Sequence, residues 1–91
     1  MNAHIDHDPT TNRFTTEVDG QRSVLSYRIA GDVMQIVHTA VPPAVAGRGI
    51  AGALVKAAMG LAQRGGLRVD PQCAYARSYL QRHPETPVQH A

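Results

Sequence analysis

Residues 41–54 read Val-Pro-Pro-Ala-Val-Ala-Gly-Arg-Gly-Ile-Ala-Gly-Ala-Leu, and this stretch decides the fold of the chain. The two prolines end a preceding strand, because neither donates a backbone hydrogen bond. The turn Gly47-Arg48-Gly49 then opens a helix whose first N–H groups have no partner within it. Glycines let an anion approach these groups, and Arg48 adds a forked cationic donor. The stretch therefore predicts a phosphate or pyrophosphate site, although two glycines also suit an ordinary turn.

Three segments with alternating apolar side chains precede this stretch, and short turns join them. Strands are expected at 13–18, 23–29 and 33–41, because apolar residues recur there at every second position. Asp19-Gly20, between the first two segments, is a strong signal for a tight hairpin. Together the three segments predict an antiparallel meander.

The alternation on the third strand also assigns its faces. Met34, Ile36, His38 and Ala40 occupy alternate positions and are expected on one side. His38 is then either a half-buried histidine bonded to the backbone or a base that works near neutral pH.

After the glycine turn the pattern changes to that of a helix, expected at 48–64, with a short strand at 67–70 and a second helix at 74–82. The expected fold is α/β (α+β), a β-meander followed by β-α-β-α. Its sheet is mixed, because a strand–helix–strand unit forms a parallel pair with a right-handed crossover. A ligand belongs at the carboxyl end of the third strand, where the glycine turn lies.

The chain has 91 residues, which make one small domain with a thin core. We expect a polar N-terminal segment at 1–12 whose first residues are loosely ordered, a single domain at 13–84 and an irregular tail at 85–91. The thin core and the unmatched sheet edges suit either a monomer or a homodimer.

Composition excludes several classes of protein. The net charge is only +2 and the basic residues are scattered, which argues against a nucleic-acid partner. The single cysteine, Cys73, rules out an internal disulfide and suits a reducing compartment. No apolar run approaches the roughly 20 residues of a membrane span, and the first residues lack the features of a signal peptide. We therefore expect a cytoplasmic protein without a membrane partner.

Three motifs in order carry a resemblance to a known family. They read His38-Thr39-Ala40-Val41-Pro42, then Ala46-Gly47-Arg48-Gly49-Ile50-Ala51, then Pro71-Gln72-Cys73 followed by Tyr79-Leu80-Gln81-Arg82-His83-Pro84. In these motifs the chain resembles the very small members of the GCN5-related N-acetyltransferases, from residue 13 to residue 84. Two positions differ from the family pattern: Ala46 replaces an Arg or Gln, and Ala40 replaces a Glu.

The resemblance implies that the chain uses acetyl-CoA and acetylates an amine, on a small molecule or on a protein. It also implies which backbone holds the pantetheine arm and pyrophosphate of CoA: Val41, Ala46, Gly47, Arg48, Gly49, Ile50 and Ala51.

The resemblance further implies three catalytic candidates, His38, Cys73 and Tyr79. His38 would lie beside the acyl group and accept a proton from the amine. Cys73 would line the acceptor pocket during direct transfer, or carry the acetyl group itself. A tyrosine of the last helix would protonate the departing thiolate, and spacing alone does not choose between Tyr75 and Tyr79, of which Tyr79 is assigned.

Two further points complete the sequence-based expectations. The histidines show no metal-binding spacing with Cys73 or with carboxylates, so no metal site is predicted. Because Ala40 lacks the carboxylate of the family, the alternative function is a CoA-binding or interaction module without turnover.

Overall fold

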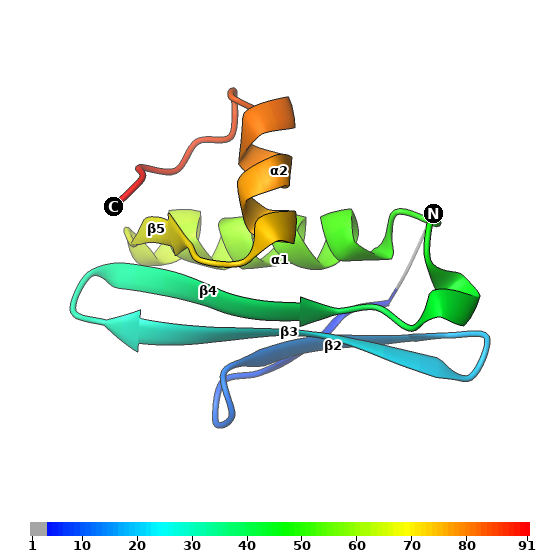
Figure 1. Cartoon of the computed structure of the whole chain (residues 1–91). Coiled ribbons are helices and arrows are strands. Elements are labelled where there is room, and N and C mark those ends of the chain that lie inside the picture. Colours follow the sequence, from blue (N-terminus) through cyan, green and yellow to red (C-terminus); the bar gives the residue numbers. More distant parts are fainter. Residues whose placement is uncertain (1–3) are drawn as a thin grey trace.

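The computed structural model describes residues 4–91, in which both helices lie on one face of a five-stranded sheet (Figure 1). The longer helix runs along the sheet, and the second one extends away from it. The elements in chain order are β1 (Asp6–Asp8), β2 (Arg13–Val18), β3 (Gln21–Ala30), β4 (Val33–Ala40), the 3₁₀ helix η1 (Pro43–Val45), α1 (Ile50–Gly65), β5 (Arg68–Pro71) and α2 (Ala74–Arg82).

The sheet has the strand order β1-β2-β3-β4-β5. The first four strands pair antiparallel in succession, and β4 pairs parallel with β5. At the hairpin between β2 and β3, Asp19 and Gly20 both have a positive φ, 51° and 73°, as a type I′ turn requires. The predicted meander, mixed sheet and tight hairpin are therefore confirmed.

Strand β4 contains one irregularity. Ser26 on β3 pairs with His38, whereas the next residue, Tyr27, pairs with Ile36. Val37 is thus an extra residue on β4, a β-bulge. The bulge shifts the alternation of β4 by one position, so that side chains beyond it exchange faces.

This shift changes the residues that face the helices. Thr39 is only 6% exposed and lies on the helix side, whereas His38 is exposed on the opposite face. The prediction that His38 and Ala40 share the face of Met34 and Ile36 is therefore wrong. A period-two pattern cannot show that a residue has been inserted, and one inserted residue reverses every face after it.

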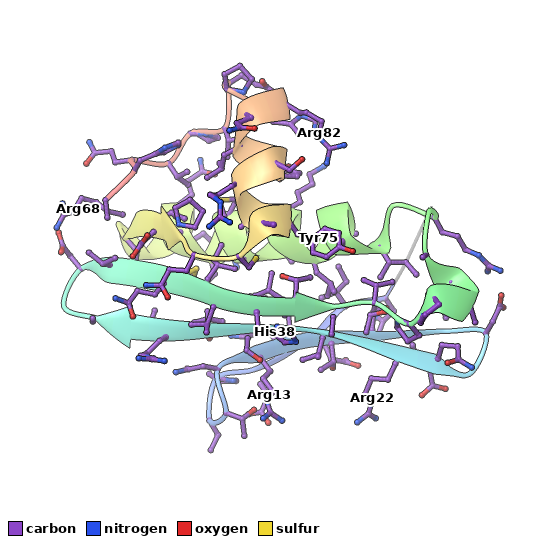
Figure 2. All side chains as sticks on the ribbon, viewed as in Figure 1. Arg13, Arg22, His38, Arg68, Tyr75 and Arg82 are labelled. Atoms are coloured by element: carbon purple, nitrogen blue, oxygen red, sulfur yellow. The ribbon has the colours of Figure 1, made fainter. Side chains whose placement is uncertain are left out.

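The core lies between the helices and one face of the sheet. Leu25 and Ile36 from the sheet and Leu54 from α1 are fully buried. Burial of such an aliphatic side chain contributes roughly 1.5–3 kcal/mol, and these residues carry most of the core. The other face of the sheet has no helix over it, and Figure 2 shows Arg13 and Arg22 projecting from that side. A site formed by helices and loops must therefore lie on the covered side.

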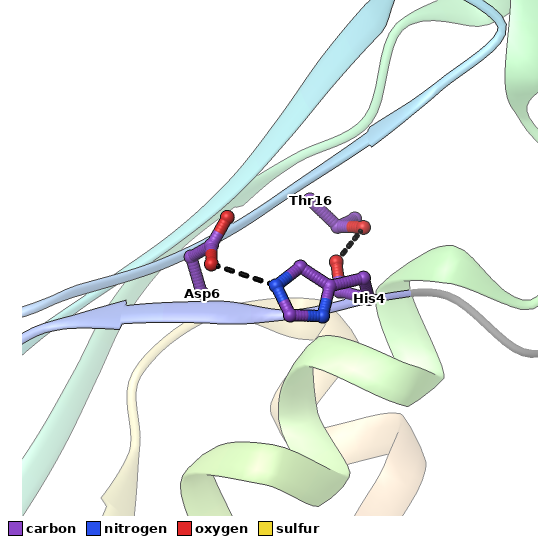
Figure 3. A network of polar contacts seen from close by, with 3 residues as sticks. All are labelled: His4, Asp6 and Thr16. Atoms are coloured by element: carbon purple, nitrogen blue, oxygen red, sulfur yellow. Dashed lines mark hydrogen bonds and ion pairs between the residues drawn. The ribbon is translucent and has the colours of Figure 1, made fainter.

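The N-terminal segment 1–12 contains a strand, which the sequence did not predict. Strand β1 pairs antiparallel with β2. Beside it, the Thr16 hydroxyl donates to the carbonyl oxygen of His4 at 2.6 Å, and the His4 ring lies 2.9 Å from Asp6 (Figure 3). The segment is thus part of the sheet from Asp6 onward, while the first residues, 1–3, for which loose order is expected, lie outside the described part.

The C-terminal tail 85–91 returns to the sheet. The Val69 N–H donates to the carbonyl of Gln89 at 2.7 Å, and the Ala91 N–H donates to the carbonyl of Val69 at 2.8 Å. These bonds form a parallel bridge between Val69 and His90 at the outer edge of β5. The expectation of an irregular tail is wrong at its end, because the unpaired backbone groups of the edge strand accept it as a partner.

Candidate functional site

A glycine turn leads from η1 into α1. Gly47 and Gly49 have φ values of 81° and 79°, which side-chain-bearing residues rarely adopt, and Gly49 caps the helix. The first helical hydrogen bond runs from the Ala53 N–H to the Gly49 carbonyl at 3.0 Å. Within residues 4–91 the N–H groups from Gly49 to Gly52 form no hydrogen bond to the protein. The turn therefore presents a row of unpaired donors at the positive end of α1, as its sequence predicts.

These donors border a pocket of about 190 Å³ between the turn, the start of α1 and α2. Its lining residues are Val41, Ala46, Gly47, Gly49, Ile50, Ala51, Gly52, Tyr75 and Arg82. We call this cavity the turn pocket. Every residue predicted to hold the cofactor lines it except Arg48.

Arg48 has a different partner. Its guanidinium pairs with the carboxylate of Asp19 in the hairpin between β2 and β3. Both side chains are exposed, and such a pair contributes at most about 1 kcal/mol to stability. The sequence predicts that the charge of Arg48 binds an anion at the turn, but in the structure this charge already pairs with Asp19.

Arg82 lines the turn pocket, and the sequence reasoning missed it. Tyr75 and Arg82 are seven residues apart, which places them two turns apart on the same face of α2. Figure 2 shows both side chains on one side of α2, above the end of the sheet where the turn lies. Of the described lining residues Arg82 alone is charged, so the turn pocket suits an anion. The seven-residue spacing was the signal that could have found it.

A second feature lies where β4 and β5 separate, beyond their last pair, Ile36 and Pro71. Cys73 is the N-cap of α2, and its sulfur accepts a hydrogen bond from the Ala76 N–H at 3.4 Å. The same sulfur lies 3.4 Å from the hydroxyl of Thr39, which is almost fully buried. The pairing of β4 with β5 therefore ends beside a partly buried thiol with two polar neighbours.

The structure separates the three residues predicted to be catalytic. His38 is exposed on the face of the sheet opposite Cys73. Tyr79 packs on His83 with ring centroids 4.5 Å apart and the ring planes tilted by 35°, outside the turn pocket. Burial raises the pKa of Tyr79 above its usual value, and the negative charge of Glu85 adds to this effect. Of the three, Cys73 alone lies where the pairing of β4 and β5 ends.

The N-terminal histidines have other partners. The His4 ring bonds to Asp6, and His7 Nε2 lies 2.6 Å from the hydroxyl of Tyr27. Within residues 4–91 no three metal-ligating side chains gather. None of the helices in that part of the chain is long and apolar enough to cross a membrane.

Comparisons of sequence connect this geometry to one family. The family model described as GCN5-related N-acetyl-transferase matches residues 13–89. The chain is also similar to protein NATD1 of Gallus gallus, with 35% identity over 83 residues that cover 88% of this chain and 76% of that protein. Protein NATD1 of Homo sapiens is likewise 35% identical over 83 residues, covering 88% of this chain and 74% of the relative.

A comparison of structures gives the same fold. The NMR solution structure of a GCN5-like putative N-acetyltransferase from Staphylococcus aureus matches with a TM-score of 0.72 at 22% identity. The match covers 97% of this chain and 87% of the other one. The sequence matches and the shared fold confirm the resemblance seen in the three motifs, and the chain belongs to the GCN5-related N-acetyltransferases.

Proposed function

We propose that this chain transfers an acetyl group from acetyl-CoA to an amine acceptor. The observation that carries the proposal is the turn pocket, where unpaired backbone donors from Gly49 to Gly52 meet a single cationic side chain, Arg82. Such donors at a helix N-terminus suit a pyrophosphate, which glycines allow to approach closely. Membership of the family makes CoA the expected source of that pyrophosphate.

The remainder of acetyl-CoA would follow from this anchor. The pantetheine arm would pass Val41, which borders the turn pocket just beyond the end of β4. The acetyl group would lie beyond the last pair of β4 and β5, near Cys73. Backbone N–H groups of β4 beyond Ile36 would stabilise the negative oxygen that forms as the amine attacks.

The proposed reaction is direct transfer. The amine nitrogen forms a bond to the carbonyl carbon and loses a proton, the carbon–sulfur bond breaks, and the CoA thiolate takes up a proton from a donor that the released proton restores. We assign the proton donor as Tyr75, which follows the cap residue Cys73 by two positions in the first turn of α2, rather than Tyr79, which packs on His83. His38 receives no role as the base, because its exposed position lies across the sheet from Cys73.

A second candidate function is CoA binding without turnover. No carboxylate and no imidazole belongs to the described lining of the turn pocket. The Glu of the family motif is Ala40 in this chain. A protein without a side-chain base could still acetylate an amine that arrives uncharged, so the two functions differ in turnover and not in CoA binding.

Calorimetry with CoA and with acetyl-CoA tests the shared part of both functions. Release of free thiol from acetyl-CoA, measured over a panel of small amines and lysine peptides, then separates them. Amine-dependent thiol release supports the transferase, and saturable binding without release supports the module. If neither ligand binds to the folded protein, both functions are wrong.

A further inference from the structure

A second hollow, between α1 and α2, is continuous with the turn pocket. It measures about 580 Å³ and shares Gly52 and Arg82 with that pocket. Its lining residues are Gly52, Ala53, Lys56, Tyr79, Arg82, His83 and Glu85. We call it the α1–α2 groove. A ligand anchored at the turn can extend into this groove while remaining against the protein.

The α1–α2 groove carries two cationic side chains on opposite walls. Lys56 follows Gly52 by four residues, so it lies on the same face of α1, about one turn or 5.4 Å further along. Arg82 projects from α2 into both cavities. Within residues 4–91 neither Lys56 nor Arg82 forms an ion pair. Both charges are therefore available to an anion.

The groove also contains one carboxylate, which has its own partner. Glu85 lies 3.3 Å from His83 Nδ1. The groove thus keeps an excess of positive charge near Lys56 and Arg82. Gly52 lines both cavities, and a Cβ atom built on it meets no atom within 4 Å, so no side chain fills the space beside this residue.

CoA carries two separate phosphate groups, the pyrophosphate and a monophosphate on the 3′ oxygen of its ribose. The backbone donors of the turn suit the first group, which needs few side-chain charges. A second anionic group on the same molecule requires a second set of donors nearby. Lys56 and Arg82 provide charged donors, one helical turn beyond the pyrophosphate position.

We propose that the α1–α2 groove binds the 3′-phosphate of CoA through Lys56 and Arg82, so that the protein distinguishes CoA from dephospho-CoA. This inference rests on the proposed function, because it assumes that the pyrophosphate lies at the turn. The tilted ring pair of Tyr79 and His83 forms the wall beside these cations. Tyr79 is then a residue of the nucleotide site and not of the acetyl-transfer site.

Calorimetry with CoA and dephospho-CoA on the folded protein tests the inference. Charged hydrogen bonds at this partly exposed site should make the wild type bind CoA roughly tenfold more tightly than dephospho-CoA. Lys56→Ala should weaken the binding of CoA and leave that of dephospho-CoA unchanged, while Lys56→Arg should retain the preference. Arg82→Ala should weaken both ligands, since Arg82 also lines the turn pocket.

Arg22→Ala is the matched control, because it removes the same charge from the opposite side of the sheet (Figure 2). It should leave both affinities unchanged. Equal affinity of the wild type for the two ligands, equal losses of both in Lys56→Ala, or the same loss in Arg22→Ala would overturn the inference and leave the proposed function standing. If neither ligand binds, the proposed function is wrong and the inference is wrong with it.

Discussion

The hydroxyl of Thr39 lies 3.4 Å from the sulfur of Cys73, at the point where β4 and β5 separate. This contact depends on the bulge at Val37, since an uninterrupted β4 would turn its next neighbour, His38, toward the helices. The contact joins the sheet to the N-terminus of α2. It therefore lies where we propose that the acetyl group binds.

Replacement of Cys73 distinguishes direct transfer from a covalent acetyl-cysteine. Cys73→Ser should keep most of the turnover and the stability, because a serine hydroxyl can still cap α2 by accepting from Ala76. Cys73→Ala should lose about 1 kcal/mol of unfolding free energy with the cap, but should retain transfer. Denaturant unfolding and amine-dependent thiol release measure the two effects.

Mass spectrometry supplies the opposing outcome for Cys73. The wild type is mixed with acetyl-CoA without an amine, and Cys73 should remain unmodified. An acetyl adduct on Cys73 that forms and discharges at least as fast as turnover, together with an inactive Cys73→Ala variant, would contradict direct transfer.

Substitutions at the neighbouring residues His38 and Thr39 should differ in their effect on kcat/KM. His38→Ala should change kcat/KM by less than about threefold, because substitutions of exposed side chains away from the site have small effects. Thr39→Val keeps the shape of the buried side chain but removes the hydroxyl beside Cys73, and should lower kcat/KM about fivefold. A large loss in His38→Ala with an unchanged melting temperature would restore His38 as the base.

Gly52 allows a test of the turn pocket without damage to the fold. Gly52→Glu should raise the stability of α1 by roughly 1 kcal/mol, because it replaces a helical glycine and places an acid in the first turn. The same carboxylate should lower the affinity for CoA at least about tenfold by repelling the pyrophosphate. Thermal melts and calorimetry on one preparation check both effects.

The neutral variant Gly52→Gln separates charge from bulk in this experiment. It has the shape of the glutamate variant and should weaken CoA binding less. Wild-type affinity in Gly52→Glu would show that the pyrophosphate does not lie at the turn.

Asp32 should make the stability of the protein depend on pH. Its carboxylate accepts hydrogen bonds from Arg68 at 3.2 and 3.1 Å, and these bonds, with the charge of Arg68, hold the pKa of Asp32 below its usual value of 3.8. The carboxylate of Asp32 therefore binds a proton more readily in the unfolded chain than in the folded protein. The Asp32–Arg68 pair contributes fully to the free energy of unfolding well above the usual pKa, and this contribution is lost as pH falls through the lower pKa of the folded protein.

Asp32→Asn should therefore melt below the wild type at neutral pH, and this difference should shrink toward zero as the solution becomes strongly acidic. Melting temperatures across an acid series measure it. Glu17→Gln, another exposed carboxylate-to-amide change, is the control and should melt near the wild type throughout. A constant difference for Asp32→Asn at every pH would mean that its cause is not the titration of Asp32.

Local sequence determined most of the elements that build the site. Strand β2 and helix α2 have the predicted bounds, because alternating and helical apolar patterns do not depend on distant partners. The hairpin at Asp19-Gly20 and the turn with Gly47 and Gly49 follow from conformations that these residues favour. The three motifs were enough to indicate the family.

Other parts of the site depend on contacts between distant residues. Strand β1 has no apolar alternation of its own, and its pairing with β2 gives it a strand conformation. Arg48 finds Asp19 only when the fold brings the hairpin beside the turn. Arg82 belongs to the turn pocket only because α2 packs beside the start of α1.

The sequence by itself determined that a glycine turn opens α1, since backbone conformation is set by each residue and its neighbours. Tertiary structure alone decided which side chains surround that turn. Because of the bulge at Val37, Thr39 and not His38 faces the helices. Because α2 packs beside the start of α1, Arg82 and not Arg48 lines the turn pocket. The reason is physical: a side chain's partners depend on strand register and helix placement, which are fixed by burial of the whole core.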